Sequence, residues 1–350
     1  MGAMPVILGG KLMKFVRSLL LAGAVLATTQ ITAQAKELQI STWLPPTHSL
    51  HKQMEEWAKS VEEQTGGSLE VNIYPSSQLG AAPDHYDMVR DGIVEMSIAA
   101  PSLNAGRFPL WALIEVPFTF ANTTTGARAF HEWYQEYIPT EMPDVKMCFI
   151  TVHHPGALNF NKPDIRVPAD LKGLRIRHGG PILSDWMTLL GATTVPSALP
   201  EVKELADRGV IDGVTLPWDM VLFGIHTAMP YHIDEPFYVG GQAWIINQAF
   251  YDGLTDKERE VIDAHCGPDY SEKLSTKWYE EQRGFRQQLI DDPKQHVYEL
   301  TPEERKIWIE ASAPISQKAE AEVTNKWKID GAEAESKLRA KLKEHNALVE

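Results

Sequence analysis

The stretch DLKGLRIRHGGP (Asp170–Pro181) decides the fold, because it opens a second run of alternating strands and helices. Leu174–His178 predicts a strand, and the two glycines and the proline after it predict a turn into a helix. Arg175 and Arg177 lie two residues apart, so both side chains point to the same face of that strand. The predicted strand therefore carries two cationic side chains on one face, although the chain as a whole is acidic.

The segments around this stretch form two successive α/β modules. In each module short apolar or alternating segments predict strands, and segments with helical spacing separate them, which is typical of a parallel sheet with covering helices. The first module has expected strands at Leu38–Trp43, Leu69–Tyr74, Ile93–Ala100 and Val145–His153, and expected helices at Leu50–Thr65, Tyr86–Asp91 and Thr123–Tyr137. The second has expected strands at Leu174–His178, Thr193–Val195 and Gly213–Leu216, and expected helices at Ile182–Leu190 and Glu201–Arg208.

The C-terminal part of the chain has a different character. Phe237–Asn247 predicts a strand that crosses back to the first module. Thr255–His265 and Tyr270–Asp291 predict long charged helices, and Thr301-Pro302 followed by two glutamates predicts the start of another helix. The predicted fold class is therefore α/β, with enough residues for two domains.

The N-terminal segment has the layout of a secretory signal. It carries three cations and no acidic residue, then an apolar run, Phe15–Ala27, and then Ala33-Gln34-Ala35. We predict a signal peptide over residues 1–35, and Met13 is a better signal start than Met1. A membrane anchor is the alternative, but a spanning helix needs about 20 apolar residues and this run is shorter.

The charge of the remaining chain excludes some partners. Of the 33 Lys and Arg residues, the three in the signal segment are removed, which leaves 30 against 47 Asp and Glu residues, a net charge of −17. Nucleic acids and anionic membrane surfaces are bound through Lys/Arg patches, so neither is an expected partner. A small anionic ligand is not excluded, because a pocket sets its own local field. No later segment is apolar enough to span a bilayer, so the product is expected to be exported without membrane insertion.

Motifs for catalysis and cofactors are missing from the sequence. It lacks the P-loop and dinucleotide glycine patterns, the G-x-S-x-G elbow, H-E-x-x-H and C-x-x-C. We therefore expect no catalytic residues, no cofactor and no metal, and an exported α/β enzyme is a less favoured function. Cys148 and Cys266 are the two cysteines, and both a disulfide and a pair of buried free thiols remain open.

Five segments in the same order resemble one protein family. They are GGSLEVNIYPSSQLG (Gly66–Gly80), MVRDGIVEMSIAAPS (Met88–Ser102), VPFTFAN (Val116–Asn122), NKPDIRVPADLKGLRIR (Asn161–Arg177) and LADRGVIDG (Leu205–Gly213). Together they look like the solute-binding protein of a TRAP transporter, the tripartite ATP-independent periplasmic type. The resemblance covers essentially all of residues 36–350.

The resemblance implies a two-domain periplasmic-binding-protein-like fold, with a cleft between the domains and long C-terminal helices. Domain I would comprise 36–154 plus about 239–290, and domain II about 155–238 plus about 291–350. The function it implies is capture of an organic acid anion in the periplasm and delivery to the TRAP membrane subunits. A ligand-loaded protein that is presented to a sensor kinase is a further alternative with the same cleft.

The resemblance assigns the main ligand contact to Arg177, the last residue of the family pattern LKG-x-[KR]-[ILV]-R. Its guanidinium would form a two-pronged salt bridge with the ligand carboxylate, a geometry that fixes both direction and strength. Arg175 would be a cation at the solvent edge. The alternative is that Arg177 pairs with an internal Asp or Glu.

Three departures from the family pattern disfavour a sugar acid as the ligand. Many members carry a second arginine where this chain has Gly156. Sialic-acid-type members carry an asparagine at Leu216, and a family tyrosine is replaced by Lys203. Polar contacts are lost at these places, so a polyhydroxylated ligand is not expected.

Aromatic residues at expected strand ends favour an apolar ligand body, because ligands of α/β sheets bind at such ends. One arginine with aromatic walls suits a monocarboxylate with an apolar or aromatic body. A C4-dicarboxylate or small 2-oxo acid is the alternative, with a histidine as second anion contact. The candidate ligand-binding residues besides Arg177 are Trp43, His48, Ser102, His154, Trp218, Phe237 and Tyr238. For Trp43 and Trp218, simple core packing stays an open alternative.

Overall fold

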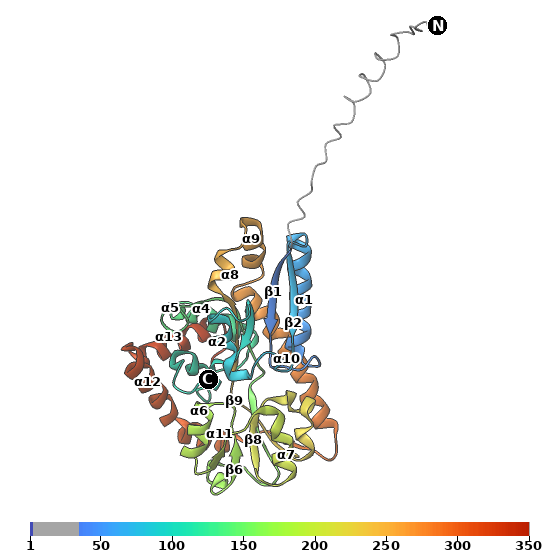
Figure 1. Cartoon of the computed structure of the whole chain (residues 1–350). Helices are drawn as coiled ribbons and strands as arrows, with labels where there is room; N and C mark the ends of the chain where they lie inside the picture. The colour runs from blue at the N-terminus through green and yellow to red at the C-terminus, as the bar shows by residue number, and fades with distance from the viewer. Residues whose placement is uncertain (3–34, 350) are drawn as a thin grey trace. The chain divides into compact units, whose positions relative to one another are not determined.

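The computed structural model describes residues 1–2 and 35–349 of the chain, and Ala35–Glu350 forms one compact unit. The predicted signal peptide lies almost wholly outside the described residues. Two β-sheets organise this unit, each covered by helices (Figure 1). In the part of the chain that the structure describes, no helix is long and apolar enough to cross a membrane.

The first sheet has the strand order β2-β1-β3-β10-β4. The predicted parallel pairing is present among β1, β2 and β3, whereas β10 runs antiparallel to both β3 and β4. Buried apolar side chains of these strands pack against α1, α9 and α10. We call this sheet and its helices the first lobe. Its strands are β1 (Lys36–Ser41), β2 (Leu69–Tyr74), β3 (Met96–Ala99), β4 (Val145–Val152) and β10 (Gly241–Asn247).

The second sheet has the strand order β11-β9-β5-β8-β6-β7, and we call it and its helices the second lobe. Here β6 pairs in parallel with β7 and β8, while β5 is antiparallel to β8 and β9. The strands are β5 (Gly156–Phe160), β6 (Arg175–Arg177), β7 (Thr193–Val195), β8 (Gly213–Leu216), β9 (Tyr231–Tyr238) and β11 (His296–Tyr298). The two lobes thus correspond to the two α/β modules of the sequence.

Two short segments carry the chain from one lobe to the other. The chain leaves β4 and enters β5 through 153–155, and it leaves β9 and enters β10 through 239–240. The segments are hydrogen-bonded to each other, because the His153 N–H donates to Gly240 O at 3.2 Å. The single strand predicted over Phe237–Asn247 is therefore wrong. The chain breaks at Gly240, so Phe237 and Tyr238 end β9 in the second sheet and Gly241–Asn247 forms β10 in the first.

Helices cover both sheets, and α10 joins the lobes. It packs on α4 and β4 of the first lobe and continues to β11 of the second. The α-helices are α1 (Ser49–Thr65), α2 (His85–Arg90), α3 (Pro109–Ala112), α4 (Thr124–Tyr134), α5 (Ile138–Glu141), α6 (Pro181–Leu189), α7 (Val202–Asp207), α8 (Gln248–Asp252), α9 (Asp256–Ala264), α10 (Pro268–Asp291), α11 (Pro302–Ser312), α12 (Pro314–Trp327) and α13 (Gly331–Glu344). Short 3₁₀ helices are η1 (Ala82–Asp84), η2 (Pro101–Leu103), η3 (Leu113–Glu115), η4 (Pro168–Leu171), η5 (Leu199–Glu201), η6 (Trp218–Phe223) and η7 (Ile225–Thr227).

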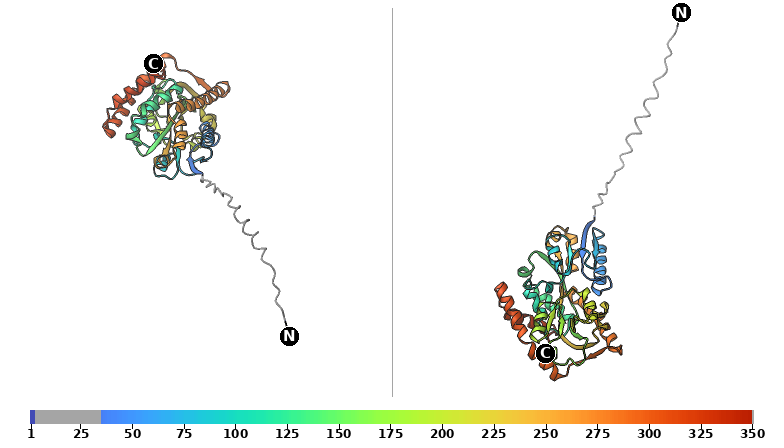
Figure 2. Two further views of the ribbon diagram at one scale, coloured as in Figure 1. Left: turned by 90° about the horizontal axis from the view of Figure 1, so that it is seen from above. Right: turned by 60° about the horizontal axis from the view of Figure 1, so that its bottom comes forward.

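The C-terminal helices return to the first lobe. The predicted start of α11 is confirmed, since the Thr301 and Glu304 side chains cap each other's backbone and Pro302 is the first helical residue. Helix α12 then packs on α3 and α6, and α13 packs on α4. Figures 1 and 2 show these red C-terminal helices together at one side of the molecule. The predicted long C-terminal helices are thus confirmed, while the predicted domain boundaries stay a prediction.

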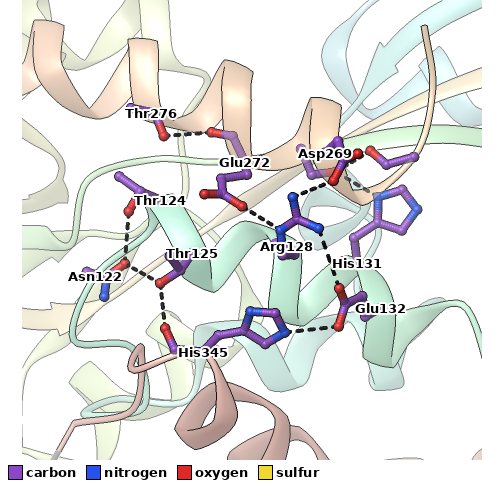
Figure 3. Close-up of polar contacts among 12 residues, drawn as sticks. Asn122, Thr124, Thr125, Arg128, His131, Glu132, Asp269, Glu272, Thr276 and His345 are labelled. Carbon is purple, nitrogen blue, oxygen red and sulfur yellow. Dashed lines mark hydrogen bonds and ion pairs between the residues drawn. The ribbon is translucent and has the colours of Figure 1, made fainter. Parts of the chain in front are cut away.

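Polar side chains of α4 connect α10 with the C-terminal segment (Figure 3). Arg128 forms ion pairs with Asp269 and Glu272 of α10. One turn later Glu132 accepts from His345 Nε2 at 3.0 Å, just after α13. Because one helix holds partners on both sides, the first lobe is braced by segments that are distant in sequence.

His131 on the same helix predicts a pH dependence of stability. Its Nδ1 lies 2.7 Å from Ser271 Oγ, and burial lowers the pKa of His131 to about 4. The unfolded chain titrates near 6.5, so between these values the unfolded state binds more protons and the free energy of unfolding falls as the pH is lowered.

We expect Tm to fall as the pH drops from 6.5 towards 4, and His131→Gln to flatten that decline. Thermal unfolding at a series of pH values measures the slope. The matched control is His296→Gln, an exposed histidine, which should keep the parent slope. An unchanged slope in His131→Gln would contradict the assignment.

A disulfide joins Cys148 of β4 to Cys266, which lies between α9 and α10. The alternative of two free thiols is therefore wrong. The bond closes a loop with a sequence separation of 118 residues, which includes every strand of the second lobe except β11.

Candidate functional site

The two arginines of β6 lie in different surroundings, although they share a strand. Arg175 is at the solvent edge, where its Nε donates to Asp212 Oδ2 at 3.0 Å and its side chain is 44% exposed. Arg177 ends the strand next to the lobe crossings and is 5% exposed. The difference follows from position along the strand: β6 ends at Arg177, where the chain turns through the glycines into α6.

Arg177 is a buried cation without an anionic partner. Its Nε and Nη2 both donate to the Ser197 carbonyl oxygen, at 3.3 and 3.0 Å. Within 1–2 and 35–349, no Asp or Glu forms an ion pair with it, so the alternative of an internal salt bridge is wrong. Burial lowers the pKa of Arg177 to about 10, and nearby Tyr238 opposes this shift. The guanidinium therefore stays charged at neutral pH and is suited to bind an anion.

Tyr238, at the end of β9, lies close to this cation. Its hydroxyl is buried and makes no hydrogen bond of good geometry within the described part of the chain, and burial raises its pKa above the usual range. The ring occupies the space above Gly156, because a Cβ there would lie 2.3 Å from Tyr238 Cζ. Tyr238 thus fills the space that any side chain at position 156 would need.

The histidines at the end of β4 point to opposite sides. His153 lies beside Tyr238, with the ring centroids 5.7 Å apart, and a Cβ at Gly240 would lie 2.9 Å from its Nε2. His154, the predicted candidate, instead stacks on Tyr279 at 4.7 Å and lines a separate pocket of about 530 Å³ along α10. Successive residues of an extended segment face opposite ways. The sequence therefore predicts that a histidine faces this site, but it does not show whether it is His153 or His154.

His48 and Trp218 lie near Asp219. His48 Nδ1 caps α1 by accepting from Leu50 N at 3.1 Å, and its Nε2 lies 3.5 Å from Asp219 Oδ2. Trp218 is fully buried in the core of the second lobe, where its Nε1 has no partner among the described residues.

The other predicted residues differ in burial. Phe237 is fully buried among Phe118, Trp186 and Trp308, which is core packing. Trp43 is partly buried against the core of the first lobe. Ser102 belongs to η2, and its buried Oγ makes no hydrogen bond of good geometry in the described part of the chain.

Sequence reasoning missed one charged residue of this region. Glu115 of η3 is 4% exposed, and burial raises its pKa to about 7, while the neighbouring Ser102 hydroxyl opposes this shift. It lies beside Gly180 of the second lobe, since a Cβ there would be 2.9 Å from Glu115 Oε2. The signal that marks it is a single acid in the otherwise apolar run LWALIEVPFTF (110–120).

A narrow crevice between the lobes reaches this carboxyl. It measures about 20 Å³ and is lined by residues 101–112 around η2 and α3, by Glu115, by the first residues of α6 and by Glu322 of α12. That volume holds about one water molecule, so an organic acid needs the lobes to separate before it enters. Arg177, Tyr238, His153 and Glu115 thus come from both lobes and from the segments that cross between them.

Comparison with known proteins gives consistent matches. The profile of a family described as bacterial extracellular solute-binding protein, family 7, matches residues 40–322. The 2,3-diketo-L-gulonate-binding periplasmic protein of Escherichia coli (strain K12) is 25% identical over 314 residues, 86% of this chain and 92% of the relative. The C4-dicarboxylate-binding periplasmic protein of Rhodobacter capsulatus is 26% identical over 266 residues, 73% of this chain and 78% of the relative.

A solved structure shows the same fold. A TRAP solute binding protein from Rhodoferax ferrireducens, in complex with copurified benzoate, superposes with a TM-score of 0.83. It is 28% identical, and the superposition covers 89% of this chain and 99% of that protein. The similarity therefore extends over both lobes.

Proposed function

Because the chain belongs to family 7 of the bacterial extracellular solute-binding proteins, which serve TRAP transporters for organic acids, we propose that Arg177 holds the carboxylate of its ligand. The family consists of transport proteins and not of enzymes. The observation that carries the proposal is the buried, charged guanidinium without an internal carboxylate, placed beside the lobe crossings. A ligand carboxylate supplies the missing negative charge through two parallel hydrogen bonds.

The protein acts in the periplasm after removal of the predicted signal peptide, and it delivers the acid to TRAP membrane subunits. Binding proceeds by closure of the two lobes around a ligand that contacts both. The connected crossings at 153–155 and 239–240 are suited to such bending, since they are short and lie side by side.

The ligand is a monocarboxylate with an apolar or aromatic body. Tyr238 and Trp218 supply buried aromatic surface near Arg177 and Asp219, and Gly156 and Leu216 leave the site without the polar contacts of sugar-acid binders. A relative at 28% identity carries benzoate, which has this chemistry.

A C4-dicarboxylate is the second candidate, because the Rhodobacter capsulatus relative is named for such ligands. The buried Glu115 carboxyl argues against it above the raised pKa of Glu115, because the ionised carboxyl and a second ligand carboxylate would then place two negative charges in a medium of low dielectric constant.

A thermal-shift screen of the exported chain tests the function. The panel contains benzoate, phenylacetate, mandelate, succinate, malate and pyruvate, and the recovered ligand is analysed after incubation. We expect stabilisation by aromatic monocarboxylates and no chemical change. Consumption of the ligand, or stabilisation by none of the acids, contradicts the proposal.

Substitution of Trp218 distinguishes an aromatic monocarboxylate from a C4-dicarboxylate as the ligand. We expect Trp218→Ala to weaken binding of the aromatic acid by about 1–2 kcal/mol more than binding of succinate, because only the aromatic ring loses its stacking surface. Calorimetric titration with both ligands measures the difference, and Trp218→Phe, which keeps an aromatic surface, is the control. Equal losses for the two ligands would mean that Trp218 is structural.

A further inference from the structure

Glu115 differs from the other buried glutamates of the described residues. Its Oε2 makes no hydrogen bond in that part of the chain. Glu141, by contrast, accepts from the Leu110 and Trp111 N–H groups, the Tyr134 hydroxyl and Trp327 Nε1. Glu235, Glu258 and Glu335 are each held by an arginine or by hydroxyl and backbone donors. A buried carboxylate oxygen without a donor is unfavourable, so its persistence points to a donor from elsewhere.

Two glycines allow other segments of the chain to pass close to the Glu115 carboxyl. Gly180 and Gly240 face it from the second lobe and from a crossing segment, and a Cβ at Gly180 would lie 2.9 Å from Oε2. Gly180 precedes α6, but Oε2 accepts no hydrogen bond from that helix. The crevice between the lobes reaches the same carboxyl. Glu115 is thus accessible when the lobes separate and enclosed when they close.

Glu115 and Arg177 both lie near Tyr238, and in the described part of the chain they form no ion pair with each other; Gly240 links Glu115 to the neighbouring His153, since a Cβ there would lie 2.9 Å from His153 Nε2 and 3.9 Å from Glu115 Oε1. Both act on the pKa of the Tyr238 phenol, Arg177 by lowering it and Glu115 by raising it. His153 lies beside the same ring and beside Gly240. A molecule held by its carboxylate on Arg177 therefore extends over Tyr238 towards the Glu115 carboxyl.

We propose that Glu115 is a specificity-determining residue of the anion site: its Oε2 accepts a hydrogen bond from a hydroxyl or N–H group of the ligand, which selects a donor-bearing monocarboxylate over a dicarboxylate. The inference rests on the proposed function, because Arg177 must hold the carboxylate. At a pH above the raised pKa of Glu115 the carboxyl is ionised, so a ligand donor satisfies Oε2, whereas a second carboxylate brings two anions together and is rejected; the titrations below are therefore run at pH 8.

The test compares carboxylic acids with and without a hydroxyl donor, a methoxy group or a second carboxylate. Calorimetric titration of the exported chain uses benzoate, the three monohydroxybenzoates, the matching methoxybenzoates and isophthalate, and a second set of phenylacetate, mandelate and succinate. We expect one hydroxylated acid to bind at least about 10-fold tighter than its parent, the range for a charge-assisted hydrogen bond. The methoxy acid, which cannot donate, should show no gain, and the diacids should bind more weakly than the hydroxylated acid.

Variants assign the preference to Glu115. Glu115→Leu should reduce the ratio of hydroxylated to parent affinity to about 1, and Glu115→Gln, which keeps a neutral acceptor, to an intermediate value. Glu141→Gln removes charge from the other buried glutamate of this region and should lower Tm without changing the ratio. If Glu115→Leu fails to fold, the near-isosteric Glu115→Gln still tests the ratio.

The outcomes separate this inference from the proposed function. Binding that Arg177→Ala abolishes, but that shows no donor preference or keeps it in Glu115→Leu, overturns the role of Glu115 alone. Tight binding of succinate or isophthalate that persists in Glu115→Leu overturns it as well. Absence of binding by every acid of both sets overturns the anion site together with this inference.

Discussion

Replacing Arg177 by alanine is expected to weaken carboxylate binding by about 2–5 kcal/mol, which is roughly 30-fold to several thousand-fold in Kd. The guanidinium is buried and pairs with no carboxylate among residues 35–349, where it donates only to the Ser197 carbonyl oxygen, so its charge is left for a ligand to neutralise. Calorimetric titration with the acid that gives the largest thermal shift measures the loss. Arg177→Lys should lose an intermediate amount, because it keeps the charge but not the planar fork.

Arg175→Ala is the matched control on the same strand. Arg175 is partly exposed and already paired with Asp212, so we expect a change in Kd of less than about threefold. Equal losses for the two arginines would defeat the assignment of the ligand to Arg177.

The same position should show opposite effects on ligand binding and on stability. An unpaired buried charge destabilises the fold, so Arg177→Met should keep or raise Tm without ligand while it removes the ligand-induced shift. A lower Tm in this variant would show that the guanidinium is needed for folding.

Removal of the disulfide is expected to lower the free energy of unfolding by about 2–5 kcal/mol. The bond closes a loop of more than 100 residues, and constraint of the unfolded chain grows with loop length. Chemical denaturation of the double variant Cys148→Ser/Cys266→Ser, compared with the parent, measures the loss. The reduced parent should match the variant, and an oxidised parent that is no more stable would contradict this expectation.

This prediction also has an internal check. Each single serine variant should be as unstable as the double variant, because either one breaks the same bond. Ligand affinity should change little, since Cys148 and Cys266 lie in the core of the first lobe and away from Arg177.

Much of the fold could be predicted because strand and helix periods are local properties of the chain. The limits of β2 and β7 match the prediction, and the start of α11 follows from its own capping residues. The break at Gly240 could not be predicted, because the largely apolar pattern of Phe237–Asn247 runs through it and the packing of His153, which requires a glycine at 240, comes from another part of the chain.

The candidate site was predictable only in part. Arg177 stands in a motif and at a strand end, so it could be expected to be buried while Arg175 remains at the solvent edge. His153 and Glu115 could not be assigned, because the orientation of β4 and the approach of Gly180 are set by residues far along the chain. The disulfide likewise depends on where β4 and the start of α10 meet.

The close approach of Tyr238 to Gly156 also constrains how this protein can evolve. Any side chain at 156 collides with the aromatic ring, since a Cβ there lies 2.3 Å from Cζ. A second arginine can therefore be acquired only after Tyr238 has become small, and that first change alone leaves a void beside Arg177. The two positions form an epistatic pair, so a shift to ligands that need two arginines requires passage through a less stable intermediate sequence.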